Sequence, residues 1–366
     1  MDNELRLPVF VRASLFIVGM FALISMLYIG RGIIVPLLLS VILAIVLHPV
    51  VNFLSDNGIN RVLAIIITMI LAIAVIAAIG TFFVSQAGRF SESWPKLIEK
   101  LTETLNETVK WASGYFDISS HKIIDWITKT KGEIFTSDST SLGHTLNRLG
   151  TGVVLVFLMP VYIFMLLFYQ PLLLEFLRKL FGKHNRSQVS AIITEIKTVI
   201  QKYLTGLAIE AVIMATLNST ALLLLGIEYA IMLGIIGAFL NVIPYIGGVV
   251  AVAMPMMVAF VTKDSAWYAI YVLAAYYFIQ LIDNNYIVPR IVASKVKINA
   301  LVSIIVVLAF GALWGIPGMF LSIPLTAIVK LIFDHIEPLK PWGYLLGDTM
   351  PDLAIFKIKI KIKKKK

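Results

Sequence analysis

Two carboxylates lie inside long apolar stretches, and their position makes them the first candidates for chemistry. Glu210 lies about two turns into the apolar stretch 204–225, and Asp283 lies near the end of the stretch 266–288. An ionisable side chain within a bilayer is costly, and it usually faces a protein interior or a transport pathway. A carboxylate in a protein cavity can also exchange a proton or hold a cation. We therefore expect Glu210 and Asp283 to act in moving a solute or ion.

Both carboxylates also have a structural explanation that the sequence leaves open. Glu210 could lie close enough to the interface to reach water, and Asp283 could pair with Arg290, two turns further on. Uncharged polar residues accompany the two acids in the same apolar stretches, and we include them as candidates for the pathway: Asn218, Asn241, Gln280 and Asn284.

Two further apolar stretches are interrupted near their centres. Residues 229–261 are too few for two membrane crossings and too many for one, and each arm would measure only about 24 Å. Residues 299–333 repeat this pattern. Proline removes a backbone donor and glycine permits positive φ, so the helices must break there. The candidates at these breaks are Pro244, Tyr245, Gly247 and Gly248 in the first, and Gly315, Pro317 and Gly318 in the second.

The composition indicates that these stretches belong to a membrane protein. The chain has 366 residues, of which 59% are apolar and 14% charged, with a net charge of +10. A soluble domain has roughly 25% charged residues, so an ordinary soluble enzyme, a disordered chain and a fibrous repeat are excluded. We predict an all-α polytopic fold with about eight membrane segments, including two re-entrant helical hairpins and a small aqueous helical insert.

The apolar and polar runs divide the chain into six parts. Each hydrophobic run of about 20 residues is assigned as a span. The predicted parts are three transmembrane helices in 1–86, an external helical insert in 87–148, a fourth span in 149–174, a cytoplasmic amphipathic helix in 175–203, a transport core in 204–335 and a basic cytoplasmic tail in 336–366.

The basic residues predict the orientation of these parts. Residues 87–148 carry eight basic and eight acidic side chains, whereas 175–202 carry six basic and two acidic ones, and the tail ends in a run of lysines. Cytoplasmic loops are rich in Lys and Arg, so both termini and 175–202 are placed inside the cell. The same rule places the loop with Arg290 inside if the first hairpin is re-entrant from outside. Span 204–225 with the first hairpin, and span 266–288 with the second, then form two units of opposite orientation in the membrane. This arrangement is found in secondary transporters. The alternative, two ordinary loops between complete spans, stays open.

Other chemistries lack a signal. The chain has no phosphate-binding loop motif and no zinc-protease motif. It has no cysteine, and its five histidines are scattered without the spacing of metal ligands. We therefore expect no enzymatic activity, no cofactor, no metal site and no nucleic-acid partner.

Several motifs in the second half resemble the autoinducer-2 exporter family of permeases. They are residues 203–206 (YLTG), 241–248 (NVIPYIGG), 283–290 (DNNYIVPR) and 310–324 (FGALWGIPGMFLSIP). The order of these motifs matches the family across most of the chain. The chain departs from the family where Leu207 replaces a common Gln and where Phe310 replaces the first of two glycines.

The resemblance implies a multi-pass permease of the bacterial inner membrane that forms a homo-oligomer. The oligomer implied by the resemblance is a pentamer. Family members are linked to export of autoinducer-2, and others to sodium/proton exchange. We expect a secondary transporter that exports a small polar solute. The alternatives are a cation/proton antiporter, with a proton or sodium as the coupling ion, and a membrane scaffold that transports nothing.

Overall fold

The computed structural model describes residues 8–82, 84–85, 99, 102–103, 158–180, 186–243, 246–263, 265–292 and 296–349. Within these residues all regular elements are helices. The predicted insert 87–148 lies outside the described residues except at 99 and 102–103, and so does the tail beyond 349.

Five of the described helices are long and apolar enough to cross a membrane, and a pair bent by 62° makes a possible sixth. They are α1 (Val9–Ile29), α2 (Arg31–Asp56), the helix Arg61–Phe82, α7 (Arg186–Leu224) and α11 (Ala300–His335), and the bent pair joins Leu158–Phe168 to α6 (Gln170–Leu180). Helix α11 meets the criterion by length and composition, but it consists of two arms joined by a kink at Gly315. The remaining helices are α8 (Ala230–Asn241), α9 (Ile246–Thr262), α10 (Trp267–Ile282), η1 (Asp283–Val292), η3 (Glu337–Leu339) and α12 (Lys340–Leu346). The prediction of an all-α polytopic membrane protein is confirmed.

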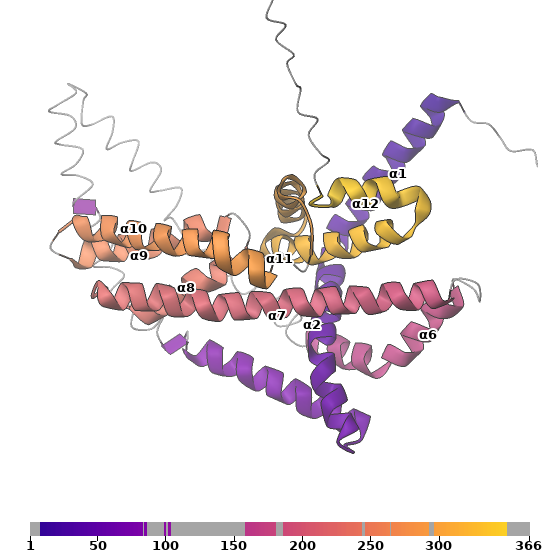
Figure 1. Cartoon of the computed structure of the whole chain (residues 1–366), viewed down its shortest axis with the longest axis horizontal. Coiled ribbons are helices and arrows are strands. Elements are labelled where there is room, and N and C mark those ends of the chain that lie inside the picture. The colour runs from indigo at the N-terminus through magenta and orange to yellow at the C-terminus, as the bar shows by residue number, and fades with distance from the viewer. Residues whose placement is uncertain are drawn as a thin grey trace, which may run out of the picture.

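Helix α7 forms the axis of the molecule (Figure 1). Its first half packs with η1 and α11 around Tyr203, Leu207 and Val307, and its second half packs with α8, α9 and α10 around Leu222. The sequence divided this region near residue 203, but α7 continues through that point without a break. Gly206 is the weak helix former here, and its lack of a side chain lets the backbone of η1 approach closely.

Small residues bring the neighbouring helices close to α7. A Cβ atom on Gly206 would lie 2.6 Å from the carbonyl oxygen of Ile291 in η1, and one on Gly234 in α8 would overlap with Ser219. In a membrane, where lipid is as apolar as a leucine side chain, such close van der Waals packing replaces the hydrophobic effect as the source of helix association. The exposed surface is correspondingly apolar, and α1 has no buried residue at all.

The seventh predicted span, 266–288, contains a change of helix type. Helix α10 ends at Ile282, and the chain continues as the π-helical segment η1. Pro289 lies within η1, and a proline inside an α-helix removes a hydrogen bond and clashes with the preceding turn. The wider π-helical turns, which occur frequently at functional sites, begin at Asp283 itself.

Both predicted breaks turn the chain back on itself. In the first, Gly247 packs so tightly on the carbonyl group of Leu240 that a Cβ atom would overlap with it. In the second, Gly315 has φ 68° and ψ −147°, and Gly318 lies against the carbonyl oxygen of Phe310. The same device, a glycine against the backbone of the preceding arm, therefore builds both hairpin tips. Pro244 and Tyr245 lie outside the described residues.

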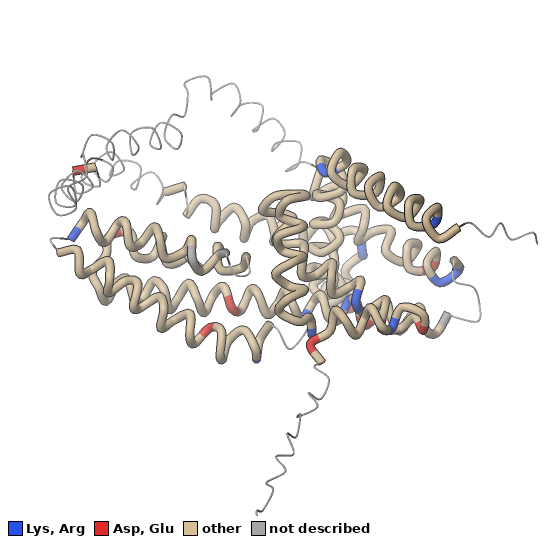
Figure 2. The backbone as a smooth tube through the Cα atoms, turned by 90° about the horizontal axis from the view of Figure 1, so that it is seen from above, with Lys and Arg blue, Asp and Glu red and all other residues tan. Residues whose placement is uncertain are grey.

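Charge is distributed unevenly along the long axis. Figure 2 shows that most of the described Lys and Arg residues gather at the end that holds α6 and the start of α7. At this end His335 Nε2 lies 3.4 Å from Glu195 Oε2, and Lys197 Nζ lies 2.9 Å from His48 Nδ1. These contacts attach the start of α7 to α11 and to α2.

Candidate functional site

A polar cavity of about 800 Å³ lies where α7, the first hairpin, α10, η1 and α11 meet. Glu210 enters it from α7, Asn241 and Gly248 from the first hairpin, and Asp283 from η1. Six of the residues predicted from the sequence line this cavity together: Glu210, Asn241, Gly248, Gln280, Asp283 and Asn284. Polar groups from segments more than 70 residues apart thus converge on one space.

The two carboxylates are joined by one amide. Asn241 Nδ2 donates to Asp283 Oδ2 over 2.9 Å and to Glu210 Oε1 over 3.3 Å. Both acids are removed from solvent, with 5% of Glu210 and 1% of Asp283 exposed. Buried carboxylates require such hydrogen-bond donors because desolvation is otherwise uncompensated. Asn241 is the last residue of α8, so the first hairpin tip directly carries the donor that connects α7 to η1.

A second amide extends this network along α10. Gln280 Nε2 donates to Asp283 Oδ2 over 3.3 Å and to Asn284 Oδ1 over 3.4 Å. A Cβ atom on Gly248 would lie 3.0 Å from Gln280 Oε1. Glycine at this position therefore allows the hairpin backbone to lie against the amide of Gln280, and a larger residue would push the tip away from α10.

Three polar atoms near this network lack a hydrogen-bond partner within the described part of the chain. They are Asp283 Oδ1, Tyr276 Oη and Asn218 Oδ1, and all are buried. Asp283 and Tyr276 line the cavity. Asn218 is not part of the lining, but a Cβ atom on Gly237 would lie 3.3 Å from Asn218 Nδ2 and 3.6 Å from Tyr276 Oη. Buried polar groups are rarely left unsatisfied, so each of these atoms keeps the capacity for a further hydrogen bond.

The helical spacing explains why these side chains share a face. On α7, Tyr203, Leu207 and Glu210 recur every three or four residues, which places them on one side of a helix. On α10 and η1, Tyr276, Gln280 and Asp283 follow the same rule. The sequence analysis missed Tyr203, Tyr276, Tyr277 and Ser303, which also line the cavity. For Tyr276 the signal was present, because it lies one turn before Gln280.

The second hairpin tip borders a different space. An apolar cavity of about 790 Å³ is lined by Ile316 and Pro317 from this tip and by Val242 and Ile243 from the first. Leu207 and Val242 line both this cavity and the polar one. The two tips therefore face one apolar space, and the candidates Gly315, Pro317 and Gly318 shape it without lining the polar cavity.

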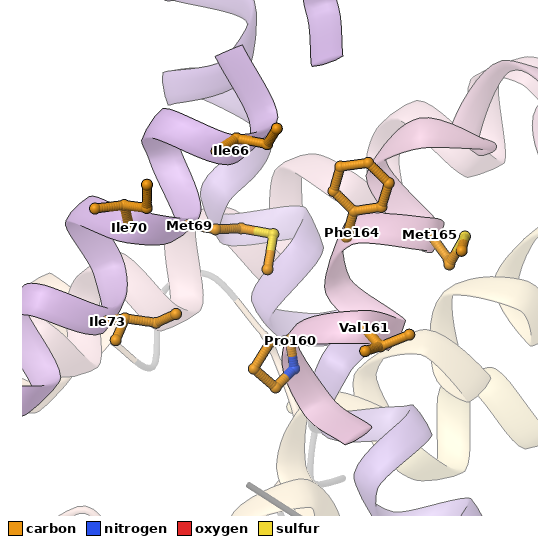
Figure 3. Close-up of a pocket in the computed structure, with 8 residues that line it drawn as sticks. All are labelled: Ile66, Met69, Ile70, Ile73, Pro160, Val161, Phe164 and Met165. Atoms are coloured by element: carbon orange, nitrogen blue, oxygen red, sulfur yellow. The ribbon is translucent and has the colours of Figure 1, made fainter. Parts of the chain in front are cut away.

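Arg290 lies away from the carboxylates as well. It lines a third cavity with Lys202, while Asp283 receives its hydrogen bonds from Asn241 and Gln280. A fourth cavity, of about 390 Å³, lies between the helices Arg61–Phe82 and Leu158–Phe168 and is lined by apolar side chains (Figure 3). Its described lining offers no polar side chain for a solute. Among the described residues no group of three or more His, Asp or Glu side chains could hold a metal ion.

The arrangement is that of a multi-pass membrane carrier with interrupted helices around a polar central cavity. The sequence profile described as "AI-2E family transporter" matches residues 15–337, so the chain belongs to the AI-2E transporter family. It is a membrane transporter of the permease type.

Individual relatives are distant but cover nearly the whole chain. The chain is 26% identical over 318 residues to YrrI of Bacillus subtilis, covering 83% of this chain and 87% of YrrI. It is 26% identical over 318 residues to the AI-2 transport protein TqsA of Escherichia coli, covering 86% and 90% of the two chains. It is also 26% identical over 310 residues to PerM of Escherichia coli, covering 82% and 86%.

Proposed function

We propose that this protein is a secondary transporter that exports a small polar solute, and that the solute binds in the cavity around Glu210, Asn241 and Asp283. The observation that carries the proposal is the convergence of two buried carboxylates and two amides on one open space beside a hairpin tip. Irregular backbone at membrane depth is tolerated where it lines a watery cavity, and interrupted helices bind substrate in secondary transporters.

The cavity chemistry favours a solute rich in hydroxyl groups. Carboxylates accept hydrogen bonds from hydroxyls, and the amides of Gln280 and Asn284 can both donate and accept. The rings of Tyr276 and Tyr277 add flat apolar surface. A polyhydroxylated, autoinducer-2-like molecule would match these hydrogen-bonding groups and rings. The name of the relative TqsA refers to autoinducer-2 transport.

Flux measurements in proteoliposomes test the proposal. Vesicles that contain the protein and are loaded with autoinducer-2 should release it faster than loaded vesicles without protein. Asp283→Asn should reduce this release rate at least tenfold. Asn285→Ala is the matched control, because Asn285 is exposed and its side chain donates only to the carbonyl group of Leu281, one turn earlier in α10. Export that is absent under every imposed gradient, or that survives Asp283→Asn unchanged, would refute the role of the cavity.

The unpartnered oxygen of Asp283 favours a second candidate, a cation/proton antiporter. Two carboxylates that share one amide donor can exchange a sodium ion for protons, and Asp283 Oδ1 is free to ligate the ion. A sodium gradient should then drive a pH change inside proteoliposomes, and Glu210→Gln should abolish it. Glu228→Gln, at an exposed turn after α7, should leave it intact. Sodium-driven exchange that persists in Glu210→Gln would exclude Glu210 as the titrating group.

We further propose a bacterial inner-membrane location with both termini cytoplasmic, and assembly as a homo-oligomer. The gathering of basic residues at the end with α6 and the start of α7 supports this orientation. Lys202 and Arg290 line one cavity, and this proximity supports assigning both basic segments to the cytoplasmic side. No residue of α1 is buried, and most of its large apolar side chains are exposed, which supports a contact between this helix and a neighbouring subunit.

A further inference from the structure

The polar cavity around Glu210 and Asp283 contains acidic side chains, and its described lining contains no Lys, Arg or His. Both carboxylates are buried, and the hydrogen bonds that they receive come from the neutral amides of Asn241 and Gln280. Two ionised carboxylates that border one space repel each other, and a buried charge is normally paired with one of opposite sign. A solute that carries a positive charge would supply this partner.

Two oxygen atoms in the wall of this cavity can accept further hydrogen bonds. Asp283 Oδ2 accepts from both Asn241 and Gln280, whereas Asp283 Oδ1 is buried and has no hydrogen-bond partner within the described residues. The hydroxyl of Tyr276 is in the same situation, and this side chain is 7% exposed and lines the same cavity. Tyr276 lies two helical turns before Asp283, so both groups border the cavity from one side.

These two acceptors favour a primary ammonium group over other cations. A primary ammonium has three N–H donors and no acceptor, so it can donate to Asp283 Oδ1 and to Tyr276 Oη. Hydrogen bonds of this kind, between charged groups, are roughly twice as strong as neutral ones. A quaternary ammonium has no N–H to donate. An inorganic ion would make no use of the rings of Tyr276 and Tyr277, which line the cavity and can attract an organic cation to their faces.

We propose that this cavity binds a hydroxylated primary amine, such as an amino alcohol or an amino sugar, in preference to a neutral polyol. The ammonium group donates to Asp283 Oδ1 and Tyr276 Oη, and the hydroxyl groups bind the polar side chains of Gln280, Asn284 and Ser303, which also line the cavity. A cavity of about 800 Å³ has room for a molecule of this size. The inference rests on the proposed function, because it takes the same cavity as the solute site, and it adds a positive charge to the solute.

Equilibrium binding to the purified full chain in detergent tests the proposal, with radiolabelled glucosamine and glucose as the probes. The two sugars differ only by an amino group in place of one hydroxyl, so the ratio of their dissociation constants isolates the contribution of the ammonium. At a pH at which the amine is protonated, glucosamine should bind at least tenfold more tightly than glucose. Equal binding of the two sugars, or no binding of glucosamine, would overturn the proposal.

Substitutions at the two acceptors test their roles separately. Asp283→Asn removes the charge and keeps the shape of the side chain, so it should bring the two affinities to within about twofold of each other. Tyr276→Phe removes only a hydroxyl, and it should weaken glucosamine binding about tenfold, the value of one hydrogen bond to a charged group. Tyr271→Phe makes the same change at an exposed position of α10 and should have no effect. A preference that persists in Asp283→Asn, or unchanged glucosamine binding in Tyr276→Phe, would overturn the proposal.

Competition with other cations tests the assignment to a primary amine. Neither choline nor sodium, at the same concentration as glucosamine, should displace it. Displacement by choline would show recognition without hydrogen bonds, and displacement by sodium would show a site for an inorganic ion, so either result would overturn the assignment. The readout is binding, which separates this inference from the proposed function. Export of autoinducer-2 without a preference for glucosamine would overturn the inference alone, whereas a preference for glucosamine without any export would support the inference and refute the proposed function.

Discussion

Replacing Asn241 with alanine would remove an amide that donates to both buried carboxylates. Asp283 would retain the donor Gln280, over 3.3 Å, and Glu210 would lose its contact with the hairpin tip. We expect Asn241→Ala to destabilise the folded protein and to detach the first hairpin from α7 and η1. Asn241→Asp should cost more, because it places a third carboxylate within reach of the other two.

The size of the effect follows from the two hydrogen bonds. A hydrogen bond to a charged group contributes about 1.5–3 kcal/mol, and a neutral one about 1 kcal/mol. The bond of 2.9 Å to Asp283 belongs in the upper class, and the bond of 3.3 Å to Glu210 is longer and weaker. Together they predict a loss of about 3 kcal/mol for Asn241→Ala.

Reversible unfolding by sodium dodecyl sulfate in mixed micelles, followed by circular dichroism, would measure this loss. Asn285→Ala is the control, since Asn285 is exposed and its amide donates to the carbonyl group of Leu281, four residues earlier in the chain. It should change stability by less than about 0.5 kcal/mol. If Asn241→Ala stays within the same limit, the hydrogen bonds between the hairpin tip and the carboxylates do not stabilise the fold, and the reasoning fails.

Three further substitutions test the elements around the site. Gly318→Ala should abolish folding of the second hairpin, because its Cβ atom would overlap with the preceding arm, whereas Gly19→Ala, with open space around it, should not destabilise the protein in the same micelle unfolding assay. Asn299→Ala should cost about 2 kcal/mol in micelle unfolding, since Asn299 caps α11 and donates to α12, and Asn299→Ser should recover part of this loss. Trp314→Phe should cost about 1 kcal/mol by losing the hydrogen bond of 3.1 Å to the carbonyl group of Leu27; an unchanged midpoint would show that this link between α11 and α1 contributes nothing.

The sequence was sufficient for the class of protein and for the location of both chain reversals. Long apolar runs and Pro-Gly interruptions are features of the local sequence. Because every backbone donor inside a membrane must be satisfied internally, an apolar run is restricted to a helix and an interruption marks where that helix ends. At Gly315 the chain adopts a positive φ, which glycine does more readily than other residues, so the residue type alone indicated where the helix would break.

Partnerships between distant residues could not be predicted in this way. The sequence offered Arg290 as a partner for Asp283, but the carboxylate bonds to Asn241, whose hairpin comes from another part of the chain. The π-helical turn that begins at Asp283 also has no simple pattern in the sequence. The close approach of η1 to Gly206 is likewise a property of the assembled helices, which the local sequence does not reveal.

The continuity of α7 has a mechanical consequence. Its 39 residues contain no proline, so the helix measures about 58 Å and behaves as a stiff rod. Near the start of α7, Glu195 contacts His335 of α11. Further along α7, Lys202 borders the cavity between α2, α7 and η1, and Glu210 borders the polar cavity. A tilt of about 5° at the basic end would displace the other end by about 5 Å. The rod can therefore act as a lever, through which a change at the membrane surface would move the wall of a cavity that no surface molecule touches.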